Sequence, residues 1–109
     1  MNNRDRQILN KILQEIEIAL SMVNGVTEHS FLDDEKLKRA VCMTLINIGE
    51  LVKNLTRELV EHNKDIPWKE VAGFRDVAAH KYQTLRMEDV YLTVTEDLLM
   101  LSDLIKKIV

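Results

Sequence analysis

Apolar residues recur every three or four positions along most of this chain, and polar residues fill the positions between them. This spacing places the apolar side chains on one face of an α-helix and differs from the strict alternation of a half-buried strand. Glycine (3) and proline (1) are scarce, so the chain has few places to turn sharply. The pattern therefore predicts an all-α fold, an up-and-down bundle of four main helices.

Capping and turn residues bound the first two expected helices. The first carries its apolar stripe over residues 8–23 and ends at Asn24-Gly25, because glycine readily takes the left-handed conformation that stops a helix. After a short connector, Asp33 or Asp34 caps the second helix, with acidic residues at the positive end of its dipole. This second helix is the longest and is expected to continue, over more than six turns, to His62-Asn63.

A proline and a regular apolar period mark the third and fourth expected helices. Pro67 suits the first turn of a short third helix, which is expected to end near His80. The fourth helix shows the most regular period, over residues 87–108. Three apolar residues fall outside its main stripe: Leu92, Leu99 and Met100. They predict either an oligomer interface or a wider core.

Two small residues of the long helix bear on packing. Gly49 lies inside its apolar stripe, where glycine costs about 1 kcal/mol relative to alanine. Two interpretations are open: a neighbouring helix packs closely there, or the glycine is simply tolerated. Cys42 lies between helix-spaced apolar residues and is expected to be a small core residue.

Length and composition restrict the class of protein. We expect 109 residues to form one domain, residues 1–109. A single cysteine, a start unlike a signal peptide and the lack of a membrane-length apolar run indicate a cytoplasmic protein. The net charge of −3 argues against a nucleic-acid binder held by a global positive field. Any contact with RNA would need a local basic surface.

Residue types suited to phosphate chemistry collect in the run Phe74–Tyr82. Arg75 offers a planar fork of donors for a phosphate, and His80 can exchange a proton near neutral pH. On an ideal helix their side chains point about 140° apart, so they flank a cleft unless the helix loosens before His80. Asp76 shares a face with His80 and could orient its imidazole. The alternative is a surface helix end with an incidental histidine.

No metal or cofactor is expected from the sequence. His29 and His62 lie in or beside loops without the clustered ligands that a metal site needs. A glycine-rich phosphate loop and a nucleophile elbow are both absent.

Several short segments occur in a specific order along the chain. They are Gly25-Val26-Thr27 with Phe31, Ile48-Gly49-Glu50, Ile66-Pro67-Trp68, the run Gly73–Tyr82 and the later Val94–Leu98. Through these segments the chain resembles the HepT-type toxins of the HEPN superfamily over nearly its whole length. The resemblance implies an all-helical, two-fold homodimeric prokaryotic ribonuclease that needs no metal. It also implies a partner, a small nucleotidyltransferase antitoxin of the MNT type, in a type VII-like toxin–antitoxin pair.

The resemblance also assigns roles to individual residues. Arg75 and His80 fill the family's Arg-x4-6-His motif, and Asp76 fills the polar position after the arginine, where asparagine is common. Tyr82 matches the tyrosine that the antitoxin modifies with AMP. Phe74 stands where methionine is common. The extra negative charge of Asp76 could slow turnover or sharpen the role of the histidine.

The expected mechanism is attack by the RNA 2′-hydroxyl on the adjacent phosphate. His80 would move the protons and Arg75 would stabilise the developing charge, with a second copy of both residues supplied across a two-fold axis. Lys81 and Arg86 would widen the positive rim for RNA, although a solvated helix-end charge is the alternative for each. For Glu50 we expect a hydrogen bond to the short helix, with a role in the site as the second interpretation.

Two rival functions belong to other classes. The chain could be a non-catalytic helical subunit that docks a nucleotidyltransferase and presents Tyr82, or a purely structural four-helix protein. The residues at 66–82 make the structural protein the weakest of the three hypotheses.

Overall fold

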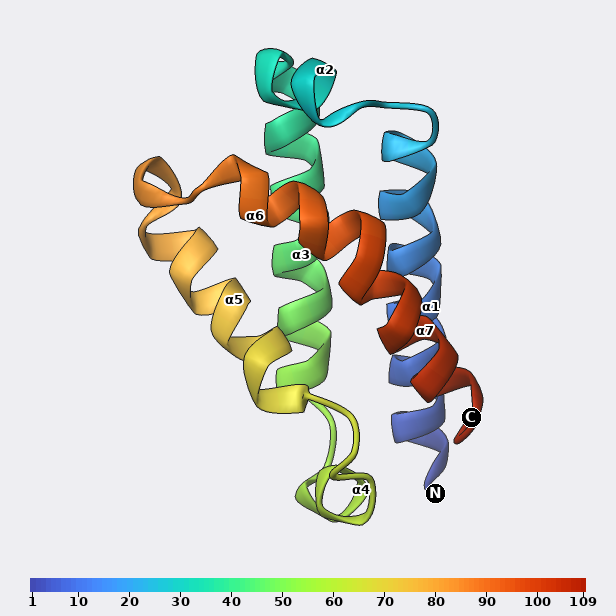
Figure 1. The fold of residues 1–109 in the computed structure, drawn as a ribbon. Coiled ribbons are helices and arrows are strands. Elements are labelled where there is room, and N and C mark those ends of the chain that lie inside the picture. The colour runs from blue at the N-terminus through green and yellow to red at the C-terminus, as the bar shows by residue number, and fades with distance from the viewer.

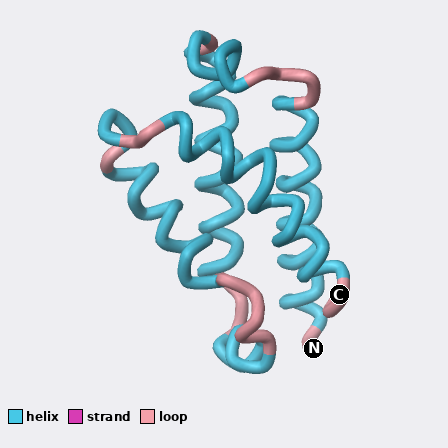
Figure 2. Tube along the Cα trace, in the orientation of Figure 1, coloured by secondary structure: helices cyan, strands magenta, loops and turns pink.

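Every regular element in the computed structural model, which describes residues 1–109, is helical (Figure 2). In chain order the elements are α1 (Asn3–Val23), α2 (Glu28–Asp33), α3 (Glu35–Lys53), α4 (Arg57–His62), α5 (Trp68–His80), the 3-10 turn η1 (Tyr82–Thr84), α6 (Met87–Leu92), the π-helical turn η2 (Thr93–Asp97) and α7 (Leu98–Lys106). The all-α prediction is confirmed. None of these helices combines the length and the apolar character needed to cross a bilayer.

The long helices α1 and α3 lie side by side and antiparallel, and α5 flanks α3 on its other side (Figure 1). The continuous segment α6–η2–α7 runs obliquely in front of α3 and α1. The short helices α2 and α4 lie at opposite ends of the bundle, and both chain termini lie near the same end.

The core is built from the predicted stripes. Side chains of α1, α3 and the C-terminal segment bury against one another, including Leu9, Ile12, Ile16, Ile48, Val94 and Ile105. Cys42 is fully buried among them, as predicted. At the far end, the Phe31 and Tyr91 rings pack with centroids 5.4 Å apart, and Tyr91 Oη donates to the Val26 carbonyl at 2.6 Å. These contacts fasten α2 to α6.

The predicted helix boundaries hold at three places. Gly25 has φ 74°, the left-handed conformation expected just beyond the end of α1. Asp34 is the cap of α3, because its carboxylate accepts the Leu37 N–H at 3.0 Å. The third long helix, α5, ends at His80 and begins one residue after Pro67.

The prediction of one long helix up to His62-Asn63 is wrong. The helix stops at Lys53, and Thr56 caps a separate α4 by accepting the Leu59 N–H at 3.3 Å. Thr56 is held there by Asp5, which is 2% exposed and accepts its N–H at 3.0 Å and its hydroxyl at 2.6 Å. A partner 51 residues away in sequence thus fixes the break.

Two smaller differences concern the connector and the last helix. The connector after Gly25 forms α2, because Thr27 accepts the Ser30 N–H and caps it. The last helix contains the π-helical turn η2 but keeps the predicted buried stripe. Three residues lie off that stripe and are exposed: Leu92 by 48%, Leu99 by 51% and Met100 by 64%. The wider-core interpretation of these residues is therefore wrong.

Candidate functional site

Close approach of α3 and α5 positions the run Phe74–Tyr82. A Cβ added at Gly49 would overlap Arg75 Cβ and would lie 3.0 Å from the Val71 carbonyl oxygen. Only glycine lets the two backbones come this near. Of the two interpretations of Gly49, close packing of a neighbouring helix is the one that the structure supports.

Arg75 lies in the junction between α3 and α5, where its side chain is 28% exposed. Its Nε is 2.9 Å from Glu50 Oε2, an ion pair without hydrogen-bond geometry, so this buried N–H lacks an acceptor. Its Nη1 donates to Asp76 Oδ1 at 3.1 Å. The hydrogen bond expected from Glu50 to the short helix is therefore not formed, and an ion pair with Arg75 links the two helices instead. The guanidinium is fixed in place and flanked by two carboxylates.

Asp76 accepts from two cations on different helices. Lys53 Nζ, at the end of α3, lies 2.9 Å from the same Oδ1 that Arg75 contacts. The hydrogen bond from Lys53, followed by the one from Arg75, holds the pKa of the Asp76 carboxyl below its ordinary value. Asp76 is therefore ionised at neutral pH and ties α5 to α3.

His80 lies at the last position of α5 and is exposed. No hydrogen bond or ion pair joins it to Asp76, whose carboxylate is directed to Lys53 and Arg75 instead. The Asp76–His80 pair suggested by the four-residue spacing is thus not formed in a single chain. Arg75 and His80 share one helix but are not in contact through any hydrogen bond.

Tyr82, in η1, packs against the N-terminal half of α3. The Arg39 guanidinium carbon lies 5.0 Å from the centre of its ring, a cation–π contact. Its hydroxyl is buried without a hydrogen-bond partner. Burial raises the pKa of Tyr82 above its ordinary value, and the nearby Cys42 adds to this effect. The tyrosine oxygen that the family resemblance marks for modification is therefore enclosed in this chain.

Lys81 and Arg86 flank η1, and both are exposed. Lys81 forms no ion pair; its carbonyl accepts the Thr84 hydroxyl at 2.9 Å. Arg86 Nε lies 3.9 Å from Asp89 Oδ2, a loose pair at the start of α6. Both cations are therefore available to an incoming anion.

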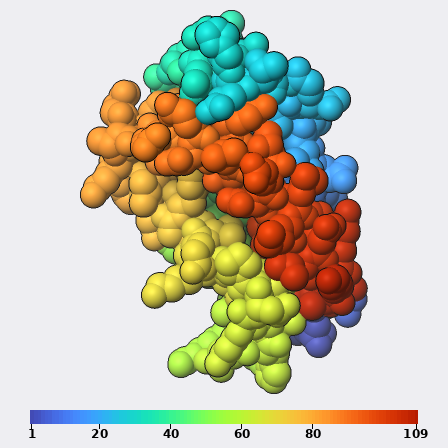
Figure 3. Space-filling view, viewed as in Figure 1, coloured from blue at the N-terminus to red at the C-terminus, as the bar shows by residue number.

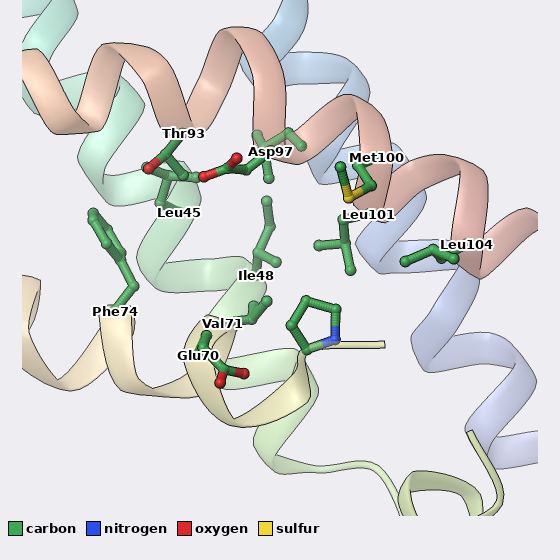
Figure 4. A pocket seen from close by; sticks show the side chains of 12 residues that line it. Leu45, Ile48, Glu70, Val71, Phe74, Thr93, Asp97, Met100, Leu101 and Leu104 are labelled. Atoms are coloured by element: carbon green, nitrogen blue, oxygen red, sulfur yellow. The ribbon is translucent and has the colours of Figure 1, made fainter. Parts of the chain in front are cut away.

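On the face shown in Figure 3, a hollow separates α5 from the C-terminal segment. It is a groove of about 390 Å³ with α3 at its floor, and most of the lining is apolar. Phe74 points into it from α5, and Met100 and Leu101 enter from α7 (Figure 4). Met100 is one of the three exposed apolar residues described above. Arg75 does not line this groove, but the residue before it does.

Four charged residues meet at the α3–α5 junction: Glu50, Lys53, Arg75 and Asp76. Lys53 is the one that the sequence did not single out. Its partner is 23 residues away, so no local motif joins the two. The one available signal was its position three residues after Glu50, which places both on one face of α3.

The family assignment comes from comparison with known proteins. The family model described as "Ribonuclease HepT-like" matches residues 12–108. The chain belongs to the HepT-like ribonuclease family. This confirms the resemblance to the HEPN superfamily, and the matched region contains every residue of the candidate site described above.

Relatives of this HepT-like chain align over nearly their whole length. A provisionally named RNase of Caldanaerobacter subterraneus is 37% identical over 103 residues, covering 94% of this chain and 92% of the relative. A Methanocaldococcus jannaschii protein, also provisionally named an RNase, is 33% identical over 94% of the chain and 88% of its own length. A Thermococcus cleftensis protein, provisionally named ribonuclease HepT, is 31% identical over 90% of the chain and 89% of its own length. No solved structure gives a significant match.

Proposed function

We propose that this protein is a metal-independent endoribonuclease, the toxin of a toxin–antitoxin pair. The observation that carries the proposal is the placement of the Arg-x4-His motif in a member of a ribonuclease family. Arg75 is fixed at the α3–α5 junction, and His80 is exposed about 1.4 turns further along the same helix. A cation that cannot deprotonate and a titratable ring are thus presented by one rigid element.

The proposed reaction is an internal transesterification. The RNA 2′-oxygen attacks the adjacent phosphorus, the bond from phosphorus to the 5′-oxygen breaks, and a 2′,3′-cyclic phosphate and a 5′-hydroxyl result. His80 takes the 2′-hydroxyl proton or delivers a proton to the leaving oxygen. Arg75 donates hydrogen bonds to the phosphoryl oxygens as their charge builds up.

A homodimer supplies the groups that one chain lacks. The two proton transfers occur on opposite sides of the phosphorus, but the motif supplies a single histidine, His80, in each chain. Two-fold symmetry would bring a second Arg75 and His80 to a shared cleft. Exposed apolar residues support a second copy: Leu92, Leu99 and Met100 lie on α6 and α7, and Val77, two residues after Arg75, is 46% exposed.

The partner that we propose is a nucleotidyltransferase antitoxin acting on Tyr82. The tyrosine oxygen would attack the α-phosphate of ATP, and pyrophosphate would leave as the phosphodiester to AMP forms. Incubation with the antitoxin and ATP should add AMP-sized mass increments to the wild-type chain and none to Tyr82→Phe. Tyr91→Phe is the matched control, because the Tyr91 hydroxyl is bonded to Val26 elsewhere in the fold. Increments that persist in Tyr82→Phe would contradict the assignment.

The decisive experiment on the nuclease is His80→Ala. We expect RNA cleavage to fall by about 10²–10⁴-fold, because a positioned proton-transfer group contributes this factor. Helical circular dichroism should not change, since the imidazole is exposed and makes no hydrogen bond. His29→Ala removes another exposed histidine, on α2, and should cleave like the wild type. Equal cleavage by purified His80→Ala and wild type would end the nuclease assignment.

One observation favours a second candidate, a non-catalytic subunit that docks the nucleotidyltransferase. In the single chain the Arg75 guanidinium is already flanked by Glu50 and Asp76. Overproduction in bacteria separates the two functions. A nuclease should stop growth, and Arg75→Ala or His80→Ala should restore it, whereas a docking subunit should be harmless in every form.

A further inference from the structure

Two cations from two helices converge on one oxygen atom at the α3–α5 junction. Lys53 Nζ is 2.9 Å from Asp76 Oδ1, and Arg75 Nη1 is 3.1 Å from the same atom. A phosphoryl oxygen accepts charge-assisted hydrogen bonds from lysine and arginine at the same distances. The carboxylate oxygen therefore occupies a position that a phosphate oxygen of RNA could take.

The charges of this cluster balance in the absence of RNA. Lys53 and Arg75 contribute two positive charges, and Glu50 and Asp76 contribute two negative ones. The side chains of Lys53 and Asp76 are 41% and 52% exposed, so a phosphate from solution can reach both. The junction thus has the donors of an anion site, with a carboxylate from the protein itself filling it.

We propose that Lys53 is a further phosphate-contacting residue of the ribonuclease site and that Asp76 is the anion which the RNA backbone displaces. This inference rests on the nuclease function proposed above, since it names a substrate contact of the same site. Binding would rotate the exposed Asp76 side chain away and leave Lys53 and Arg75 together on one phosphate. Asp76 then restrains the site, in contrast to the orienting role beside His80 that the spacing suggested.

A purely structural role for Lys53 is the main alternative. In that case its ion pair with Asp76 only ties α3 to α5, and removing either charge should weaken the fold without a specific effect on RNA. The two accounts predict different RNA affinities for Asp76→Asn. If the contact were only a structural tie, the affinity of the folded chain for RNA would not change. If Asp76 is a displaced anion, its neutral variant no longer competes with phosphate, and RNA would bind more tightly.

The test measures binding of a labelled single-stranded RNA by His80→Ala chains, which should cleave it about 10²–10⁴-fold more slowly than the wild type. Lys53→Ala should weaken binding about two- to fivefold, the range for one exposed ion contact. It should also reduce the slope of log affinity against log salt by about 0.7, the value for one phosphate contact on a single strand. Lys53→Arg should restore both quantities, because it keeps the charge.

Two variants complete the design. Asp76→Asn should tighten RNA binding by a similar factor. Lys36→Ala is the matched control, because Lys36 is an exposed, unpaired lysine near the start of the same helix, about 25 Å from Lys53. It should bind RNA like the parent chain.

The outcomes separate this inference from the proposed function. If wild type cleaves RNA and His80→Ala does not, but Lys53→Ala binds RNA with unchanged affinity and salt slope, the nuclease stands and the role of Lys53 is refuted. Unchanged or weaker binding by Asp76→Asn would also refute it, as would a complete lack of RNA binding by the His80→Ala chain. The nuclease function is tested separately: it is refuted if the wild-type chain does not cleave RNA.

Discussion

The two sides of α3 are packed in different ways. Toward α1 the contact is mainly apolar, with Ile12, Ile16 and Ile48 almost fully removed from water and a single side-chain hydrogen bond at its edge. Toward α5 the backbones meet at Gly49, and the side chains that join them include four charged groups. Within α5 only Trp68 and Ala78 are buried.

This difference separates stability from chemistry. Apolar burial stabilises by roughly 25 cal/mol per Å² and needs no particular partner, whereas ion contacts depend on exact register. Here the apolar side holds the bundle, and the polar side holds Arg75 and Asp76 where an anion can reach them. Changes on the first side should therefore affect folding, and changes on the second should affect the site.

The largest expected effect is on the apolar side. Ile12→Ala should lower the free energy of unfolding by about 2–5 kcal/mol, because it removes a fully buried side chain and leaves a cavity. Urea denaturation followed by circular dichroism measures this. Ile18→Ala is the matched control on the same helix, since Ile18 is 48% exposed, and it should change stability far less. Equal losses of unfolding free energy in the two variants would contradict the view that the apolar side of α3 holds the bundle.

An intermediate effect is expected at the close approach of α3 and α5. Gly49→Ala forces the new Cβ against Arg75 and should destabilise by about 1–3 kcal/mol through overpacking, reduced by the better helix propensity of alanine. The rate of RNA cleavage should also fall, by more than the fraction of unfolded chains accounts for, because α5 moves away from α3. Gly73→Ala, on α5, meets nothing within 4 Å and should be neutral or stabilising. Cleavage unchanged in Gly49→Ala would show that the approach does not position the site.

The smallest effect is the pH dependence of the Asp76 contacts. Lys53, and then Arg75, lower the pKa of this carboxyl in the folded chain. Its contribution to stability is therefore complete above the ordinary aspartate pKa near about 4 and is lost as pH falls through the lowered value. The stability difference between wild type and Asp76→Asn should shrink in urea titrations as pH drops from about 5 to 2. A difference that stays constant over this range would contradict the ion contact.

Much of the fold follows from local pattern. The stripes of α1, α3 and the C-terminal segment can be predicted because burial on one helix face imposes their spacing. The break after Lys53 cannot, because Thr56 is held by the buried carboxylate of Asp5, and no local pattern connects residues 51 positions apart. The apolar stripe continues through the break and so conceals it.

The candidate site divides in the same way. Arg75 and His80 stand out by residue type and spacing within one helix. Lys53 joins the cluster only through the register of α3 against α5, which Gly49 sets. The burial of the Tyr82 hydroxyl likewise depends on how η1 folds back on α3, with Arg39 over the ring. Such details come from contacts between helices and have no signature in the spacing of residues.

The enclosed oxygen of Tyr82 bears on how quickly the proposed nucleotidyltransferase partner could modify this chain. A transferase needs that oxygen in its own active site, so η1 must first swing out from α3. At saturating transferase and ATP, the proposed reaction could then run no faster than this segment opens. Newly synthesised chains, in which η1 has not yet docked, would be the fastest to accept the nucleotide.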